Sequence, residues 1–161
     1  MLTAVACGSD DGSRDYSVPS TFCGTRVDAE ELTPFLPPGR RIAVEPDVSP
    51  GTAWCDVSVD GKLAVRTVQT WWQGGRDTAH FLRGQTLREM EASAENGRFV
   101  YSGTQGFGKT KGCVDEKYGQ ELYTGFQVFD TDHEDADAMK RLIVSFTERV
   151  ERSDACDGPS E

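Results

Sequence analysis

Five cysteines are the residues of this sequence whose chemistry is most informative. Cys7 lies close to the N-terminus, whereas Cys23, Cys55, Cys113 and Cys156 are spread widely through the rest of the chain. Four widely spaced cysteines are typical of two disulfide bonds, which persist only in an oxidising compartment. We therefore expect an extracytoplasmic domain that holds two disulfides, with one cysteine left over.

The pairing of these four cysteines is not decided by the sequence, because three connectivities are open. We favour Cys23 with Cys55 and Cys113 with Cys156, since each bond then stays within one half of the chain. Each would stabilise the fold by about 4 kcal/mol on the chain-entropy estimate. A zinc site is the weaker alternative, because no Cys-x-x-Cys occurs and both histidines are distant in sequence from the cysteines.

The remaining cysteine has the surroundings of a lipid attachment site. Val5-Ala6-Cys7-Gly8 resembles the end of a bacterial lipoprotein signal peptide, although Ala4 stands where leucine is usual. The polar residues 8–15 that follow are typical of a tether. Six residues precede Cys7, fewer than an export signal needs, so we expect the full-length protein to begin further upstream. The alternative is a free N-terminal thiol.

Residues 103–110 match the phosphate-loop pattern Gly-x-x-x-x-Gly-Lys-Thr at every position. In such a loop Lys109 would reach the outer phosphates, Thr110 would hold magnesium, and a helix would begin at the Gly-Lys-Thr. The next residues are Lys111-Gly112-Cys113, which disfavour a helix. We interpret the segment as a glycine-rich connection and expect no nucleotide and no other cofactor.

Other catalytic or metal-binding patterns are weak. His80 and His133 lie near the starts of two expected helices without a catalytic motif beside them, so we expect them at the surface. The acidic run at 130–137 lacks the glycine and the distal glutamate of a calcium loop. We expect it to cap and solvate the last helix, and we expect no metal site.

The best candidate contact surface is the segment Trp71-Trp72-Gln73-Gly74-Gly75. Adjacent strand residues point to opposite faces, so one tryptophan should enter the core and the other should leave it. An exposed tryptophan beside Gly74 and Gly75 would anchor a ligand or a partner. The alternative is that the second tryptophan packs against a helix or a loop.

Composition narrows the range of partners. The chain has 161 residues, a formal net charge of −10 and 37% hydrophobic residues. Nucleic-acid binding is disfavoured, because it needs clustered Lys and Arg. The same charge disfavours an anionic membrane surface, and no apolar stretch approaches the roughly 20 residues that span a bilayer. Membrane attachment would therefore depend on a lipid.

The apolar pattern predicts an α+β fold. We expect a largely antiparallel sheet of about five strands, with two longer helices and a short N-terminal helix packed on it. The expected helices are 29–36, 77–95 and one that carries the apolar positions from Ala136 to Val150; the expected strands are 41–45, 52–59, 62–72, 98–102 and 121–130. Residues 1–20 would be signal remnant and tether, 21–156 one domain, and 157–161 a polar tail.

The clearest turn is Asp60-Gly61. A two-residue loop would scatter apolar residues over both faces of the hairpin. We therefore favour a three-residue loop with left-handed Gly61, which pairs Val57 with Leu63 and Cys55 with Val65.

Several short motifs together resemble a group of actinobacterial lipoproteins, especially those of Streptomyces. They are Phe22-Cys23-Gly24, the Leu-Thr-Pro-Phe-Leu-Pro-Pro-Gly end of the first helix, Trp54-Cys55 and Gly112-Cys113-Val114, within residues 20–156. The resemblance implies a lipidated cysteine, a polar tether and a paired-cysteine α+β domain, and it carries no catalytic residue.

The resulting expectation is a non-enzymatic envelope lipoprotein, anchored to the outer face of the membrane through Cys7. Its domain would bind an envelope protein or a small ligand through the sheet or the 71–75 segment. The alternative is an extracellular hydrolase, which needs two carboxylates facing one pocket, at least one with a raised pKa.

Overall fold

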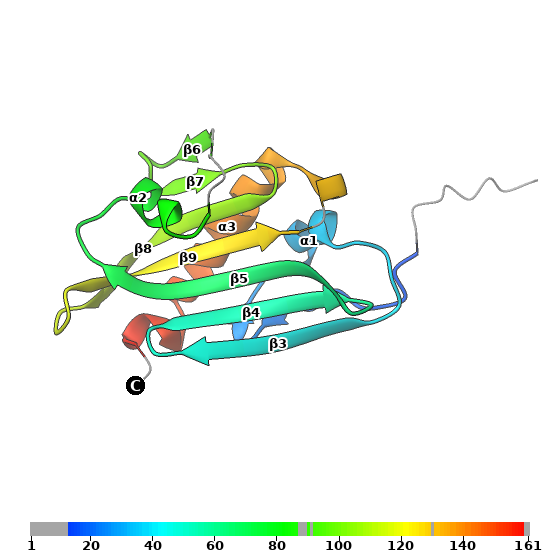
Figure 1. Cartoon of the computed structure of the whole chain (residues 1–161), viewed down its shortest axis with the longest axis horizontal. Coiled ribbons are helices and arrows are strands. Elements are labelled where there is room, and N and C mark those ends of the chain that lie inside the picture. Colours follow the sequence, from blue (N-terminus) through cyan, green and yellow to red (C-terminus); the bar gives the residue numbers. More distant parts are fainter. Residues whose placement is uncertain (1–12, 87–89, 91, 130, 160–161) are drawn as a thin grey trace, which may run out of the picture.

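The computed structural model describes residues 13–86, 90, 92–129 and 131–159, and its main feature is one seven-stranded antiparallel sheet (Figure 1). The strand order is β3-β4-β5-β9-β8-β7-β6. The strands are β3 (Ile42–Ser49), β4 (Thr52–Val59), β5 (Lys62–Gln73), β6 (Ala92–Ala94), β7 (Phe99–Tyr101), β8 (Gln105–Asp115) and β9 (Gln120–Val128). A separate two-stranded hairpin consists of β1 (Thr21–Phe22) and β2 (Thr25–Arg26).

Helices are few, and only α3 is long. The helical elements are α1 (Ala29–Leu32), η1 (Thr33–Phe35), α2 (Thr78–Arg83), η2 (Thr131–His133), α3 (Ala136–Glu151) and η3 (Asp154–Asp157). The expected fold, about five strands with two longer helices, is therefore wrong. The described chain is mostly sheet, with seven strands in the main sheet and two in the hairpin.

The expected helix over 77–95 begins as predicted but ends early. Asp77 caps α2 by accepting a hydrogen bond from His80 N, and the helix stops before Gly84. Ala92–Ala94 instead forms β6 and pairs with β7. Asn96 and Gly97 have φ values of 56° and 83°, so they form the turn of a β-hairpin rather than a helix end. Residues 87–89 and 91 lie outside the described part of the chain.

The sequence did not predict β8, just as it did not predict β1, β2 and β6, and β8 contains the glycine-rich segment expected to be a connection. Gly106 and Gly108 lie on the face that α3 covers. A Cβ atom at Gly106 would lie 2.9 Å from Ile143 Cβ, and one at Gly108 would lie 2.7 Å from the Phe99 ring. Glycine lowers strand propensity, but here it lets the helix and the neighbouring strand approach the backbone.

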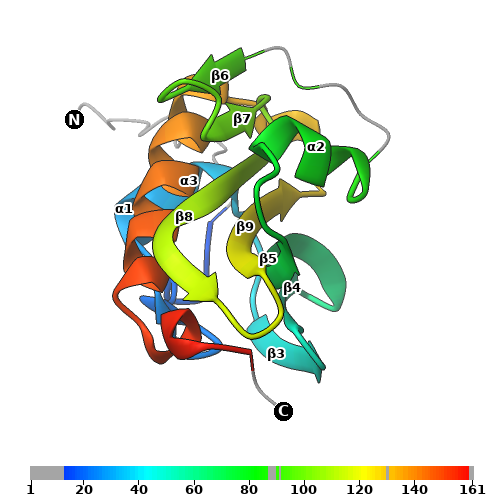
Figure 2. The ribbon, with the colours of Figure 1, turned by 90° about the vertical axis from the view of Figure 1, so that its left-hand side faces the viewer.

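The two faces of the sheet are covered differently (Figure 2). The face turned away from the viewer in Figure 1, the back face, is covered by α3, α1 and the β1–β2 hairpin. Their buried side chains and those of the sheet form the larger core, which includes Phe22, Phe126 and Phe146. On the front face, α2 covers one end with a smaller core. Its buried members are Phe81, Leu82, Val100, Phe107 and Tyr123.

The β4–β5 hairpin has a two-residue turn, so the expected register is wrong. Asp60 and Gly61 both have positive φ values, 50° and 80°, and Val59 pairs with Lys62. A shift between Val57 and Ser58 then pairs Val57 with Val65. This bulge in β5, rather than a longer loop, brings the apolar residues onto one face.

The helix α3 agrees with the expected last helix. Asp135 caps it by accepting a hydrogen bond from Ala138 N at 2.9 Å. Its buried residues recur at helical spacing and face the sheet. They are Ala138, Met139, Leu142, Ile143, Phe146, Thr147 and Val150.

Candidate functional site

The four domain cysteines form two disulfides with the favoured connectivity. Cys23 bonds to Cys55 and Cys113 bonds to Cys156, with Cα–Cα distances of 5.9 Å and 4.8 Å. The first joins the β1–β2 hairpin to β4, and the second joins β8 to η3. Two such bonds indicate an oxidising, extracytoplasmic environment. Cys7, the expected lipidation site, lies outside the described residues.

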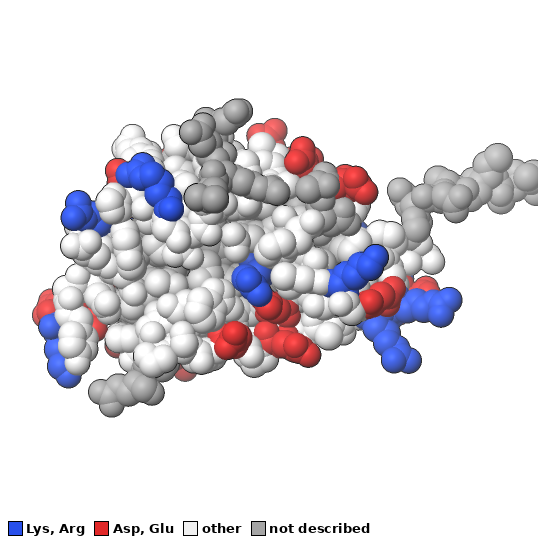
Figure 3. All heavy atoms as spheres, in the orientation of Figure 1, with Lys and Arg blue, Asp and Glu red and all other residues white. Residues whose placement is uncertain are grey.

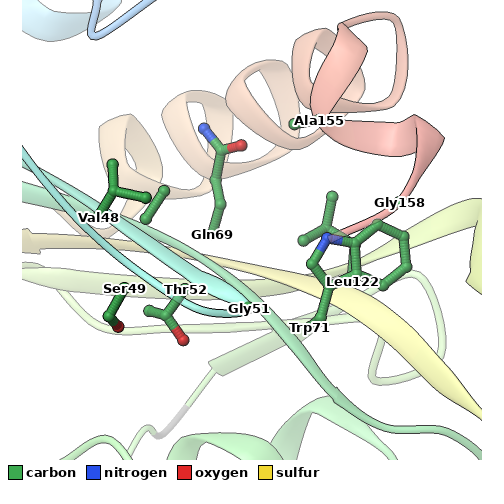
Figure 4. A pocket seen from close by; sticks show the side chains of 10 residues that line it. Val48, Ser49, Gly51, Thr52, Gln69, Trp71, Leu122, Ala155 and Gly158 are labelled. Atoms are coloured by element: carbon green, nitrogen blue, oxygen red, sulfur yellow. The ribbon is translucent and has the colours of Figure 1, made fainter. Parts of the chain in front are cut away.

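Trp71 points to the back face and is 7% exposed. Figure 4 shows its indole near Leu122, with Ala155 and Gly158 of the C-terminal segment beyond it. The cavity that these residues line has a volume of only about 60 Å³. That is too small for an organic ligand, whose pockets usually measure about 300–1,000 Å³. Trp71 therefore packs in the core.

Trp72 points to the opposite face, as expected, but it packs beneath α2. Its ring lies 5.3 Å from that of His80, 5.6 Å from that of Phe81 and 5.8 Å from that of Tyr123, measured between centroids. The predicted alternative, in which the second tryptophan packs against a helix, is the arrangement observed. Trp72 is thus held by aromatic neighbours of the small core.

Gly74 and Gly75 hold the end of β5 against the β8–β9 turn. Gly74 N donates to Gly119 O, and Gly75 N donates to the Glu121 carboxylate at 2.8 Å. Burial raises the pKa of Glu121, but hydrogen bonds from Lys109 and Gly75 outweigh it and hold the pKa below its ordinary value. The 71–75 segment is therefore engaged with its own fold on both faces.

The phosphate-loop match adopts strand geometry. Lys109 lies in β8 opposite Tyr123, and its Nζ pairs with Glu121 at 2.7 Å and donates to Arg76 O at 3.0 Å. The Thr110 hydroxyl donates to Leu122 O at 2.8 Å. The helix that a phosphate loop needs after Gly-Lys-Thr is replaced by the continuing strand.

A hollow of about 660 Å³ lies at the other end of the sheet, beside the β4–β5 turn. We call it the Phe129 hollow, because Phe129 is an aromatic side chain with 46% exposure. Its apolar lining is Pro37, Pro38, Val59, Leu63, Ala64 and Phe129, and its polar lining is Asp60, Lys62, Asp132 and His133. Its lining is divided about equally between polar and apolar surface, and its volume lies within the range of ligand sites.

The walls of the Phe129 hollow are fixed by backbone contacts. Asp60 accepts hydrogen bonds from the backbone N–H groups of Arg40 and Arg41 at 3.0–3.2 Å, which holds the turn against the preceding segment. Phe129 N donates to Ala64 O at 2.9 Å. The Arg66 guanidinium lies 6.0 Å from the Phe129 ring centroid, within cation–π range.

The N-terminal segment meets the domain next to this hollow. Arg14 donates to the carbonyls of Thr33 and Leu36, and the Tyr16 hydroxyl donates to Pro37 O. Asp15 N donates to Gly39 O at 2.8 Å. The polar segment that follows Cys7 in sequence therefore reaches the domain at the proline wall of the Phe129 hollow.

Glu31 is the carboxyl group with the most unusual surroundings among the described residues. Burial raises its pKa, while a hydrogen bond with Ser145 and the charges of Arg141 and Arg149 act in the lowering direction. Its Oε2 atom is buried without a hydrogen-bond partner in the described part of the chain. Glu31 lines a hollow of about 480 Å³ between α1 and α3, together with Asp137 and Glu148.

The rest of the front face is open sheet (Figure 3). Acidic side chains gather over its lower strands, where Glu45, Asp47 and Asp56 share the face by register. Arg66 bonds to both oxygens of Asp56, at 2.6 Å and 2.7 Å. A partner of this face would meet a polar, acidic surface rather than the aromatic anchor that the sequence predicted.

Two features of the surface were missed from the sequence. The first is the exposed Phe129. Val128 and Phe129 are consecutive apolar residues at a strand end, and because adjacent strand residues point to opposite faces, one of them had to face outward. The second is a set of arginines. Arg149 and Arg152 are three residues apart at the end of α3, so they lie on the same side of the helix.

The two histidines lie apart from each other. His80 packs on Trp72 and His133 lines the Phe129 hollow. Among the residues with a described position, no group of three or more His, Cys, Asp or Glu could hold a metal ion.

Comparison with protein-family models, with curated proteins and with solved structures finds no match. In the described part of the chain, no helix is long and apolar enough to cross a membrane.

Proposed function

We propose that this protein is a cell-envelope lipoprotein, tethered through Cys7, whose extracytoplasmic domain binds a small ligand or an envelope protein without catalysing a reaction. The extracytoplasmic part rests on the two disulfides. The anchor rests on the sequence around Cys7 and on the polar residues that follow it.

The observation that carries the binding function is the Phe129 hollow. It combines a half-exposed aromatic ring with ligand-sized volume and walls held by backbone hydrogen bonds. A preformed site loses little conformational freedom when it binds, which favours affinity. The tether meets the domain beside this site, so a bound partner would lie near the membrane.

Intact-mass measurement of the full-length protein from its membrane fraction tests the anchor and the disulfides together. We expect a diacylglyceryl adduct that is lost in Cys7→Ala, and no free thiol at the other four cysteines. A protein that is found in the soluble fraction with Cys7 unmodified would contradict the anchor. Free thiols at two or more of the other four cysteines would contradict the extracytoplasmic assignment.

Site-specific photo-crosslinking in intact cells tests the hollow. Replacement of Phe129 by benzoylphenylalanine should yield a discrete adduct, because its side chain lines the site. The same replacement of Tyr118, which is 64% exposed on the β8–β9 turn, is the matched control. No adduct from Phe129, or equal adducts from both positions, would contradict the proposal.

A hydrolase is the second candidate, and the observation that favours it is the raised pKa of Glu31 in a hollow shared with Asp137 and Glu148. A carboxyl group whose pKa is raised, in a hollow that other carboxyl groups share, is the arrangement that acid–base hydrolysis needs. Turnover of ester or glycoside substrates that is abolished in Glu31→Gln would replace the first proposal with this one.

A further inference from the structure

Three arginines from two elements meet at one hollow on the back of the molecule. Arg26 lies on β2, while Arg149 and Arg152 lie on the last turn of α3 and at its C-cap. The hollow has a volume of about 600 Å³, and Glu148 and Asp154 also line it. We call it the arginine hollow. It lies where β2, the end of α3 and η3 come together, at the lower left of Figure 2.

The three guanidinium groups have unused binding capacity. Within the part of the chain that the structure describes, none of them forms an ion pair or a side-chain hydrogen bond, although two carboxylates line the same hollow. Elsewhere in the described chain, Arg66 pairs with Asp56, Arg98 with Glu151 and Lys109 with Glu121. In a chain of net charge −10, three arginines that converge on one hollow are a local concentration of positive charge.

Both disulfides hold the walls of this hollow. The Cys23–Cys55 bond lies next to Gly24, in the turn that carries Arg26, and Gln69 further fixes that hairpin by a 2.9 Å hydrogen bond to Thr25. The Cys113–Cys156 bond fixes η3, which begins two residues after Arg152. A rigid frame lowers the entropy that is lost when long side chains converge on a ligand.

The geometry points to a binding site for a single phosphate group on a neutral or cationic carrier. A carboxylate offers two oxygens and one negative charge, whereas a phosphate monoester offers three terminal oxygens and up to two negative charges, which matches three guanidinium groups better. Glu148 and Asp154 would repel further negative charge, so polyphosphates and nucleic acids should be poor ligands. This site is separate from the Phe129 hollow and does not depend on its function.

Calorimetric titration with glycerol 3-phosphate at constant ionic strength tests the assignment, with the arginine side-chain N–H signals followed by NMR. We expect saturable binding at one site, weakened about tenfold or more in Arg149→Gln/Arg152→Gln, because charge-assisted hydrogen bonds are lost. Arg26→Gln, on a different element, should weaken it as well. Arg40→Gln removes the same charge from an exposed position elsewhere and should leave the affinity unchanged.

Non-saturable binding, or an equal loss in Arg40→Gln, would show general charge attraction and would overturn the proposal. The carboxylates give an opposite test: Glu148→Gln/Asp154→Asn should bind phosphate more tightly and should accept tripolyphosphate. If the unmodified protein already prefers tripolyphosphate, the single-phosphate assignment is wrong.

Flotation of the Cys7→Ala protein, which lacks the proposed lipid anchor, with phosphatidylglycerol vesicles separates two sources of the phosphate. Vesicle binding that requires Arg149 and Arg152 supports a lipid headgroup. Saturable glycerol phosphate binding without vesicle binding supports a soluble ligand. Vesicle binding that persists in the double variant, without glycerol phosphate binding, contradicts the site.

Discussion

At the scale of single residues, Glu31 lies in the first turn of α1 and also contacts α3. Asp28 caps α1 by accepting hydrogen bonds from Glu30 N and Glu31 N. The Glu31 carboxyl turns toward Ser145 on α3 and becomes partly buried. Because its pKa in the folded state lies above the ordinary value, folding favours its protonated form.

Glu31→Gln should therefore increase stability at neutral pH and have little effect in acid. A raised pKa contributes stability that is present below the unfolded-state value of 4.5 and lost as pH rises through the folded-state value. The variant should gain roughly 0.5–1 kcal/mol at pH 7, because it removes a partly buried charge whose desolvation Ser145 and the nearby arginines do not fully offset. Urea unfolding between pH 4 and pH 8 measures this difference.

Glu30→Gln is the control, since Glu30 is exposed in the same turn. It should show no gain at neutral pH, because its charge favours the helix N-terminus. A Glu31→Gln difference that does not change with pH, or a loss of stability at pH 7, would refute the account.

At the scale of elements, β8 is stabilised by the side chains that pack against it. Its glycines lie under α3 and beside Phe99, so the strand is stabilised by close approach rather than by its own side chains. The helix presents Met139 and Ile143 to this surface. Close packing of this kind tolerates little added volume.

Gly106→Ala should destabilise the fold by about 1–3 kcal/mol, the usual range for overpacking. The added Cβ would lie 2.9 Å from Ile143 Cβ, which is attached directly to the helix backbone and cannot rotate away. Thermal or urea unfolding measures the loss. Gly84→Ala is the control, because Gly84 has an ordinary helical φ of −84° and its Cβ would have only an ordinary contact with Phe81 O. A Gly106→Ala protein as stable as Gly84→Ala would show that α3 is not held at this distance.

At the scale of the whole molecule, the two disulfides join chain ends to the sheet. Without them, the β1–β2 hairpin would depend on Phe22 and Thr25, and η3 would depend on the end of α3. The Arg98–Glu151 pair provides an additional link between α3 and the sheet, and Glu151 also accepts a hydrogen bond from Lys111 N at 2.8 Å.

Removal of the Cys113–Cys156 bond by Cys113→Ala/Cys156→Ala should lower the free energy of unfolding by about 4 kcal/mol, from the entropy of a loop of 43 residues. The same change should weaken phosphate binding in the arginine hollow, because η3 forms part of its wall. Urea unfolding with and without reductant measures the first effect. An unchanged midpoint after complete reduction would show that the bond contributes nothing to stability.

Local chemistry was enough for several features. The expected helix starts near residues 29, 77 and 136 agree with α1, α2 and α3, and the apolar spacing from Ala136 to Val150 places α3. Asp60-Gly61 marks its turn. These features depend on residues that are neighbours in sequence, so the sequence alone determined them.

The tertiary structure decided the rest, because the deciding contacts join distant residues. The segment before the Asn96-Gly97 turn is a strand because β6 pairs with β7. The bulge opposite Val57 and Ser58 sets the register of the β4–β5 hairpin, because it brings the apolar side chains onto the buried face. The Phe129 hollow and the arginine hollow each need segments that are tens of residues apart in sequence. The sequence predicted the two disulfides from the four domain cysteines, but only the tertiary structure places both bonds beside one hollow.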